Sequence, residues 1–124
     1  MGQSVTIDLG TTVNEIIKAL DNVLTGDIKT NVPFINQQAA ALVVQAQHIA
    51  EDTNAGELTP EQRKFFLDHL ADHTKDLALM VAALTVLTAE KAWNAIVGVL
   101  WGAINTAISA ALGGIKIPLP KLVL

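Results

Sequence analysis

Apolar residues recur every three or four positions between residues 13 and 25, which is the spacing of one face of an α-helix. Thr12 followed by Glu15 fits a capping box at the start of this helix. Before it, apolar and polar residues alternate over 5–9, which is the period of an extended segment. We therefore expect an extended arm over residues 1–12 and then a helix with this apolar face: Val13, Ile16, Ile17, Leu20 and Leu24.

Two further helices are predicted to begin at Pro33 and Pro60, because proline is favoured in the first turn of a helix. The helix after Pro33 has an apolar side and a glutamine-rich polar side, and Gly56 marks its end. The helix at Pro60 has the clearest start signal, with Thr59 as its cap and Glu61 in its first turn. Its apolar residues fall along one stripe: Phe66, Leu70, Leu77, Val81 and Leu84.

The sequence leaves two paths open past residue 84. One helix over residues 60–112 would be about 80 Å long, which implies an extended assembly. Alternatively the chain breaks near residues 85–88, and Thr88 caps a fourth helix. Either path ends at Gly113 and Gly114, since the prolines of the tail that follows exclude a new helix.

The predicted fold class is therefore all-α, with three to four helices over residues 13–112, and one very long C-terminal helix as the open variant. An extended arm over 1–12 and an extended apolar tail over 113–124 flank the helices. No linker divides the chain, so residues 1–124 are expected to form a single domain.

Residues 92–115 contain no charged side chain. When residues are placed about 100° apart on a helical wheel, the segment has two unlike sides. The bulky apolar side holds Trp93, Ile96, Leu100, Trp101, Ile104 and Ile108. The other side is small and weakly polar, and we predict it as a helix-packing interface formed by Asn94, Gly98, Gly102, Asn105, Thr106, Ser109 and Ala110.

Such a helix can be buried in lipid or in protein. At about 36 Å, residues 92–115 are long enough to cross a hydrocarbon core of roughly 30 Å. Asn94 and Asn105 argue against a simple transmembrane span, because their side chains raise the free energy of insertion into lipid unless they are paired. We favour burial in protein, by other copies of the same chain, and keep lipid as the alternative.

Composition narrows the classes of protein that fit. Hydrophobic residues make up 51% of the 124 residues and charged residues only 16%, with a net charge of −4. The sequence has no cluster of Lys and Arg that could bind along a nucleic-acid backbone, so nucleic acid is not an expected partner. The sequence has no cysteine, which excludes disulfides and zinc–thiolate sites, and we find no secretory signal at the N-terminus.

Candidate chemistry is sparse. His69 and His73 have the i, i+4 spacing of a metal-binding pair, with His48 the one distant histidine, but we interpret them as a solvated polar face. The start "MGQSVT" fits the short pattern for myristoylation at Gly2, which matches often by chance. We find no catalytic set, phosphate-binding loop or paired carboxylates. No enzymatic activity, cofactor or metal is therefore expected.

These patterns favour a non-enzymatic structural subunit that self-associates through its charge-free helix and terminal arms. A phage or viral virion is the expected setting, with copies of the chain and other assembly proteins as partners. The alternative is a membrane-inserting protein of the pore-forming or holin-like kind, located at a membrane. A third hypothesis is a soluble helical domain that binds a partner or a small apolar ligand between its helices.

Overall fold

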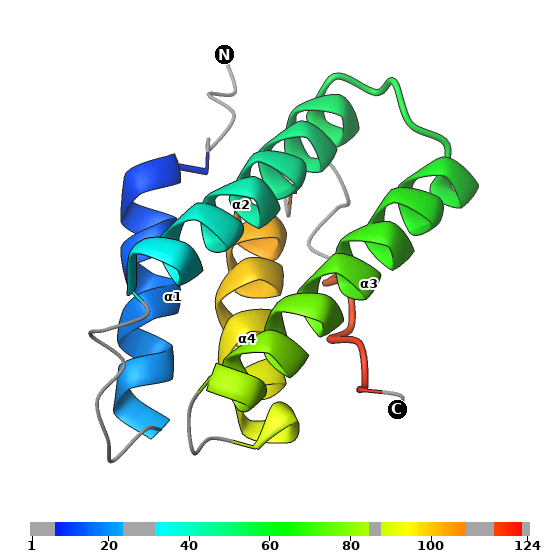
Figure 1. Ribbon diagram of the computed structural model, residues 1–124. Coiled ribbons are helices and arrows are strands. Elements are labelled where there is room, and N and C mark those ends of the chain that lie inside the picture. Colours follow the sequence, from blue (N-terminus) through cyan, green and yellow to red (C-terminus); the bar gives the residue numbers. More distant parts are fainter. Residues whose placement is uncertain (1–6, 24–31, 85–87, 109–115, 123–124) are drawn as a thin grey trace.

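The computed structural model describes residues 7–23, 32–84, 88–108 and 116–122, and these residues form four α-helices and no strand. The helices are α1 (Leu9–Val23), α2 (Val32–Asn54), α3 (Pro60–Leu84) and α4 (Ala89–Ile108). Consecutive helices run in opposite directions, and α2 and α3 cross in front of α1 and α4 at an angle (Figure 1). The all-α prediction is confirmed for the described part of the chain.

Helix α1 begins earlier than the sequence pattern predicted. Asp8, and not Thr12, caps the helix: its Oδ1 accepts a hydrogen bond from the Thr11 N–H at 2.8 Å. Aspartate is among the best N-caps, because its carboxylate satisfies a free N–H and opposes the helix dipole. The expected extended arm over residues 1–12 is therefore wrong for residues 9–12, which are helical, and residues 1–6 lie outside the described residues.

The turn between α2 and α3 follows the sequence signals. Gly56 has a φ of 71°, the left-handed conformation that glycine adopts without strain. The Gly56 and Glu57 N–H groups donate to the carbonyls of Thr53 and Asp52, which completes a Schellman motif. At the start of α3, the Thr59 hydroxyl and the Gln62 side chain each accept from the other's backbone N–H, forming a reciprocal capping box.

Helices α3 and α4 are separate, so the variant with one helix over residues 60–112 is wrong. Helix α3 ends at Leu84 and α4 begins at Ala89, and the two helices pack side by side. The Thr88 hydroxyl accepts from the Lys91 N–H at 3.2 Å and so caps α4. A threonine with competing local hydrogen bonds starts a new helix here.

The core lies between all four helices, and α4 packs against each of the other three. Small alanines at the helix contacts let the backbones approach, with β-branched and leucine side chains between them. Phe66, which the sequence pattern placed on an apolar stripe, is instead 45% exposed, and Phe34 on α2 is 41% exposed. Fully buried side chains of the core include Ile16, Leu20, Ile35, Val43, Leu70, Val81, Ile96, Leu100 and Ile104.

The C-terminal tail docks on its own chain. Residues 116–122 have no regular secondary structure, and Ile117 and Leu122 pack half-buried against the core. Asn105 on α4 makes two hydrogen bonds with the Ile117 backbone, and the Trp93 indole N–H donates to the Pro120 carbonyl at 3.3 Å. Of the extended apolar tail predicted over 113–124, residues 116–122 are docked on the bundle, because α4 supplies polar groups that hold them, and residues 113–115 and 123–124 lie outside the described residues.

Within the described residues, none of the helices combines enough length and apolarity to form a transmembrane span.

Candidate functional site

The bulky side of α4 is the interior of this bundle. Its six predicted residues are all buried against the chain's own helices and tail: Trp93, Ile96, Leu100, Trp101, Ile104 and Ile108. The two indoles, 3% and 2% exposed, contribute the largest apolar areas of the helix. The bulky side of α4 is therefore covered by other segments of the same chain.

The small side of α4 divides into three groups. Asn94, Gly98, Gly102 and Thr106 are exposed on the outer surface of the helix. Asn105 is half-buried, and both ends of its amide are used by the tail. The remaining two predicted interface residues lie outside the described residues: Ser109 and Ala110. The predicted interface is thus exposed only in part, because Asn105 contacts the chain's own tail.

The exposed glycines lie in an open groove between α4 and the N-terminal half of α1, which we call the small-residue groove. Its volume is about 560 Å³. Small side chains of α4 form one wall, and polar and acidic side chains of α1 form the other. The lining residues are Ile7, Asp8, Thr11, Thr12, Glu15, Gly98, Val99, Gly102, Ala103 and Thr106.

The α1 wall of this groove was missed by sequence analysis, because residues 7–12 were assigned to an extended arm. The Thr11 backbone N–H, followed by the Thr11 side chain, lowers the pKa of the Asp8 carboxyl below its usual value. Asp8 therefore stays negatively charged at neutral pH. On the α4 wall, the Thr106 hydroxyl donates to the Gly102 carbonyl of its own helix at 2.9 Å.

The two groove glycines have room for a larger side chain. A Cβ atom at Gly98 or at Gly102 would meet no atom of the described chain within 4 Å outside its own helical turn. Glycine inside a helix is less stable than alanine by about 0.8–1.0 kcal/mol. No contact within the described residues requires glycine at either position. The packing of the described bundle therefore does not explain why these two residues are glycine.

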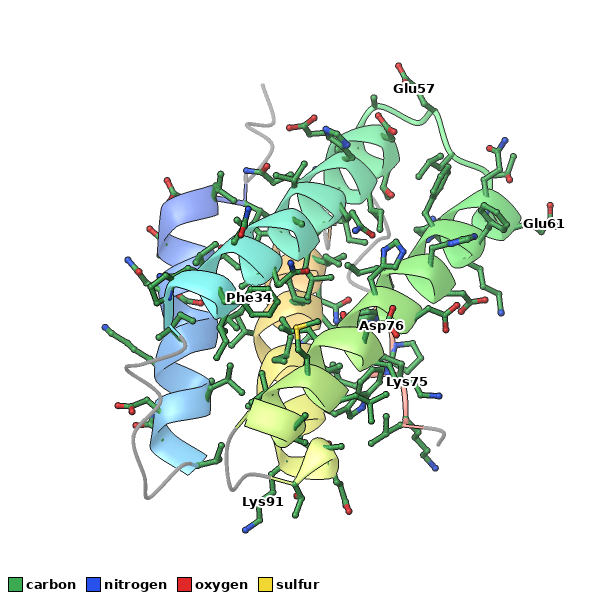
Figure 2. The ribbon with its side chains drawn as sticks, in the orientation of Figure 1. Phe34, Glu57, Glu61, Lys75, Asp76 and Lys91 are labelled. Carbon is green, nitrogen blue, oxygen red and sulfur yellow. The ribbon has the colours of Figure 1, made fainter. Side chains whose placement is uncertain are left out.

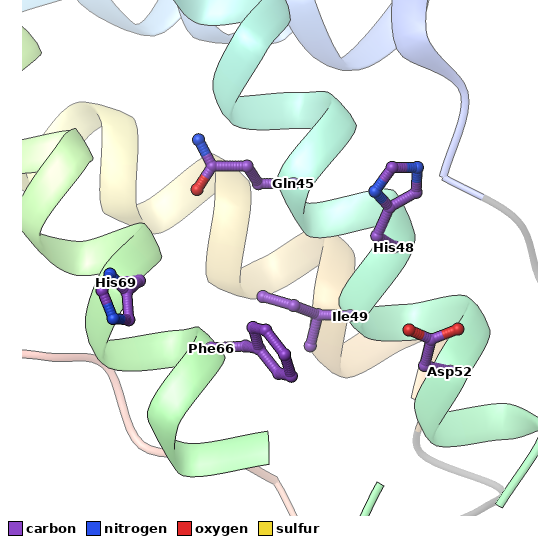
Figure 3. A pocket seen from close by; sticks show the side chains of 6 residues that line it. All are labelled: Gln45, His48, Ile49, Asp52, Phe66 and His69. Atoms are coloured by element: carbon purple, nitrogen blue, oxygen red, sulfur yellow. The ribbon is translucent and has the colours of Figure 1, made fainter. Parts of the chain in front are cut away.

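A second cleft lies between α2 and α3, and Figure 3 shows its lining. It has a volume of about 230 Å³ and is lined by Gln45, His48, Ile49, Asp52, Phe66 and His69. His48 and His69 stand on opposite sides of the cleft, with Phe66 and Ile49 between them (Figure 3). The neighbouring His73 is held by a hydrogen bond of 2.9 Å between its Nδ1 and the Gln45 side chain.

The histidines do not converge on one point. His69 packs edge-on against Phe65, and the ring centroids of His69 and His73 are 6.4 Å apart. Over the described parts of the chain, no three His, Asp or Glu side chains are close enough together to hold a metal ion. This cleft therefore offers an apolar floor with polar edges, and its aromatic residue Phe66 was assigned to the core by sequence analysis.

A third cleft lies between the start of α3 and the tail, and we call it the basic cleft. Its volume is about 310 Å³, and its lining residues are Pro60, Arg63, Lys64, Leu67, Lys116, Ile117 and Pro118. Sequence analysis missed this cleft, because only the docked tail brings Lys116 beside Arg63 and Lys64. In Figure 2 the labelled charged residues Glu57, Glu61 and Lys91 lie at the outside of the molecule.

Comparison with protein-family models, with curated protein sequences and with solved structures finds no match for this chain. The surfaces described above are therefore the basis for a functional proposal.

Proposed function

We propose that the protein is a non-enzymatic structural subunit whose copies associate through the small-residue groove between α1 and α4. The observation that carries this proposal is the pair of exposed glycines at its floor. Gly98 and Gly102 lie one helical turn apart, and a Cβ at either position would meet no atom of the described chain. Because glycine has no side chain, the backbone of a partner helix or strand could pack closely against these two positions.

The chemistry of the groove supports a protein partner. Its walls combine apolar side chains such as Val99 with hydroxyls such as Thr11 and Thr12, a mixture that occurs at contacts between subunits. The bulky side of α4 is already buried in the bundle, so self-association does not require α4 to leave its own chain. We keep a phage or viral virion as the proposed setting, because such an assembly repeats one subunit many times and needs a surface for contacts between copies.

The test is the mass of the purified protein in solution as a function of concentration, with Gly102→Leu as the probe. A Cβ at this position would meet no atom of the described chain outside its own helical turn, and leucine favours the helix over glycine, so the bundle should stay folded. If the groove is an interface, the added side chain should abolish association at concentrations at which the unmodified chain is oligomeric.

Ala41→Leu is the matched control, because it adds the same kind of bulk at an exposed position inside α2, away from the groove. It should leave the mass unchanged. An unmodified chain that stays monomeric at all accessible concentrations contradicts the proposal. A parallel flotation and dye-release assay with lipid vesicles separates it from the membrane-inserting alternative, for which Gly102→Leu should change leakage and not the mass in buffer.

A further inference from the structure

The basic cleft is an unusual gathering of positive charge in this acidic chain. The net charge is −4, yet three of the eight Lys and Arg residues line this one cleft. Lys64 has an ion pair with Asp68 at 2.8 Å, but both side chains are well exposed, so the pair is weak. Neither Arg63 nor Lys116 has an ion-pair partner in the part of the chain that the structure describes.

The cleft also has an apolar component. Leu67, buried at its floor, and the half-buried Ile117 lie among the three cations. At its edge, Pro118 is followed by Leu119, which is 56% exposed and one of the most exposed large apolar residues of the described chain. A partner for this surface must therefore offer acidic groups together with a place for an apolar side chain.

The small-residue groove has the complementary character. Its charged lining residues are both acidic, Asp8 and Glu15, and none of its described lining residues is basic. Beside Gly98 and Gly102 the described chain leaves space open, which could receive an apolar side chain of a partner. Acidic groups beside an apolar recess are the features that the basic cleft requires in a partner.

The two surfaces lie on opposite sides of the molecule. In Figure 1, α1 is on the left of the bundle and the tail over residues 116–122 is on the right, beside α3. One chain therefore cannot bring its own cleft to its own groove, but two copies can. A contact of this kind is heterologous, and its repetition builds a ring or a filament and not a closed two-fold dimer.

We propose that self-association is head to tail, with the basic cleft and Leu119 of one copy docking on the small-residue groove of the next. This inference rests on the proposed function and specifies which surface meets the groove. Arg63, Lys64 and Lys116 face the acidic side chains Asp8 and Glu15 of the neighbouring copy. Leu119 lies over the two glycines.

The experiment uses two full-length variants that each lose one surface. Gly102→Leu blocks the groove and leaves the cleft intact. Arg63→Glu with Lys116→Glu reverses two charges of the cleft and leaves the groove intact, so association of this variant should weaken roughly tenfold or more. Lys75→Glu with Lys121→Glu is its matched control, because it makes the same charge change on the same helix and the same tail, outside the cleft.

In a head-to-tail contact each variant alone should be monomeric, and an equimolar mixture should form a 1:1 dimer that grows no further. A chain with all three substitutions should stay monomeric in every mixture, and the matched control should assemble like the unmodified chain. Circular dichroism of each variant checks that the helices are retained.

Two results overturn the inference while the proposed function stands. The first is a cleft variant that still associates by itself as strongly as the unmodified chain, which indicates a groove-to-groove contact. The second is a pair of monomeric variants whose mixture stays monomeric, which shows that the two surfaces do not meet. An unmodified chain that never associates contradicts the proposed function itself.

Discussion

Replacing Asn105 with alanine tests how the C-terminal tail is held. The Asn105 Nδ2 donates to the Ile117 carbonyl at 2.9 Å, and the Ile117 N–H donates to the Asn105 Oδ1 at 2.6 Å. One side chain therefore satisfies both backbone groups of a tail residue, as a neighbouring strand would. Alanine removes both partners at once.

The magnitude follows from these two hydrogen bonds. Each half-buried hydrogen bond contributes about 1 kcal/mol net, so Asn105→Ala should lower the free energy of unfolding by about 2 kcal/mol. A loss of this size lowers Tm by about 8 °C in a domain of this length, at roughly 4 °C per kcal/mol. The half-buried Ile117 then loses the two hydrogen bonds that fix its backbone to α4.

Thermal unfolding and amide hydrogen exchange together measure the effect. Asn94→Ala is the control, because Asn94 is an exposed asparagine of the same helix whose side chain makes no hydrogen bond to the described part of the chain. It should leave Tm almost unchanged. The Ile117 amide should exchange much faster in Asn105→Ala, and in the control at the unmodified rate.

Asn105→Asp sharpens the test. At neutral pH its carboxylate can accept from the Ile117 N–H but sets an oxygen against the Ile117 carbonyl, so it should be no more stable than alanine. Below about pH 4 the protonated acid regains a donor, and its stability relative to Asn105→Ala should rise. If Asn105→Ala unfolds within about 0.5 kcal/mol of the unmodified chain and the Ile117 amide keeps its protection, the tail is not held as described.

Further predictions concern glycine, a buried hydroxyl and a helix cap. Gly98→Ala should stabilise the dilute monomer by about 0.8–1.0 kcal/mol, whereas Gly56→Ala should destabilise it by about 1 kcal/mol because of the positive φ there, both measured by urea unfolding. Thr53→Val should raise Tm, because the buried Thr53 hydroxyl has no hydrogen-bond partner in the described chain, and Thr74→Val, whose hydroxyl is bonded, should not. The lowered pKa of Asp8 means that its contribution to stability is present above about pH 4 and is lost as the pH falls through its folded-state pKa, so Asp8→Asn should flatten that part of the acid-unfolding curve.

Local signals in the sequence predicted the helix ends where one side chain decides the outcome. Thr59 caps α3 as the sequence indicated, Thr88 caps α4 as in one of the two paths left open, and Gly56 ends α2 in the left-handed conformation. At the start of α1 the cap is Asp8 and not Thr12, because the Asp8 carboxylate accepts a hydrogen bond from the free Thr11 N–H. The helix therefore begins four residues earlier than it would with Thr12 as the cap. A choice between two caps changes the end of an element, not its existence.

Contacts between distant segments could not be predicted in this way. Asn105 is a small polar residue of the kind that occurs at helix interfaces. Nothing near it in the sequence predicts that the Ile117 backbone will form hydrogen bonds with its amide. The cluster of Arg63, Lys64 and Lys116 likewise exists only because the tail returns to the start of α3. A helical wheel describes which side of α4 is bulky, but not which neighbour covers each side.

The two sides of α4 therefore have different physical explanations. The bulky side carries Trp93 and Trp101 into the core, where burial of their area stabilises the bundle, and it needs no partner beyond its own chain. On the small side, two glycines in mid-helix lower stability by about 0.8–1.0 kcal/mol each relative to alanine, and no atom of the described chain lies where their side chains would be. The two glycines destabilise the monomer without any visible gain in its packing, and a close contact with a second copy would explain why they are there. The mass of Gly98→Ala and Gly102→Leu as a function of concentration tests that explanation directly, since substitutions that stabilise the monomer and weaken its assembly separate the two roles.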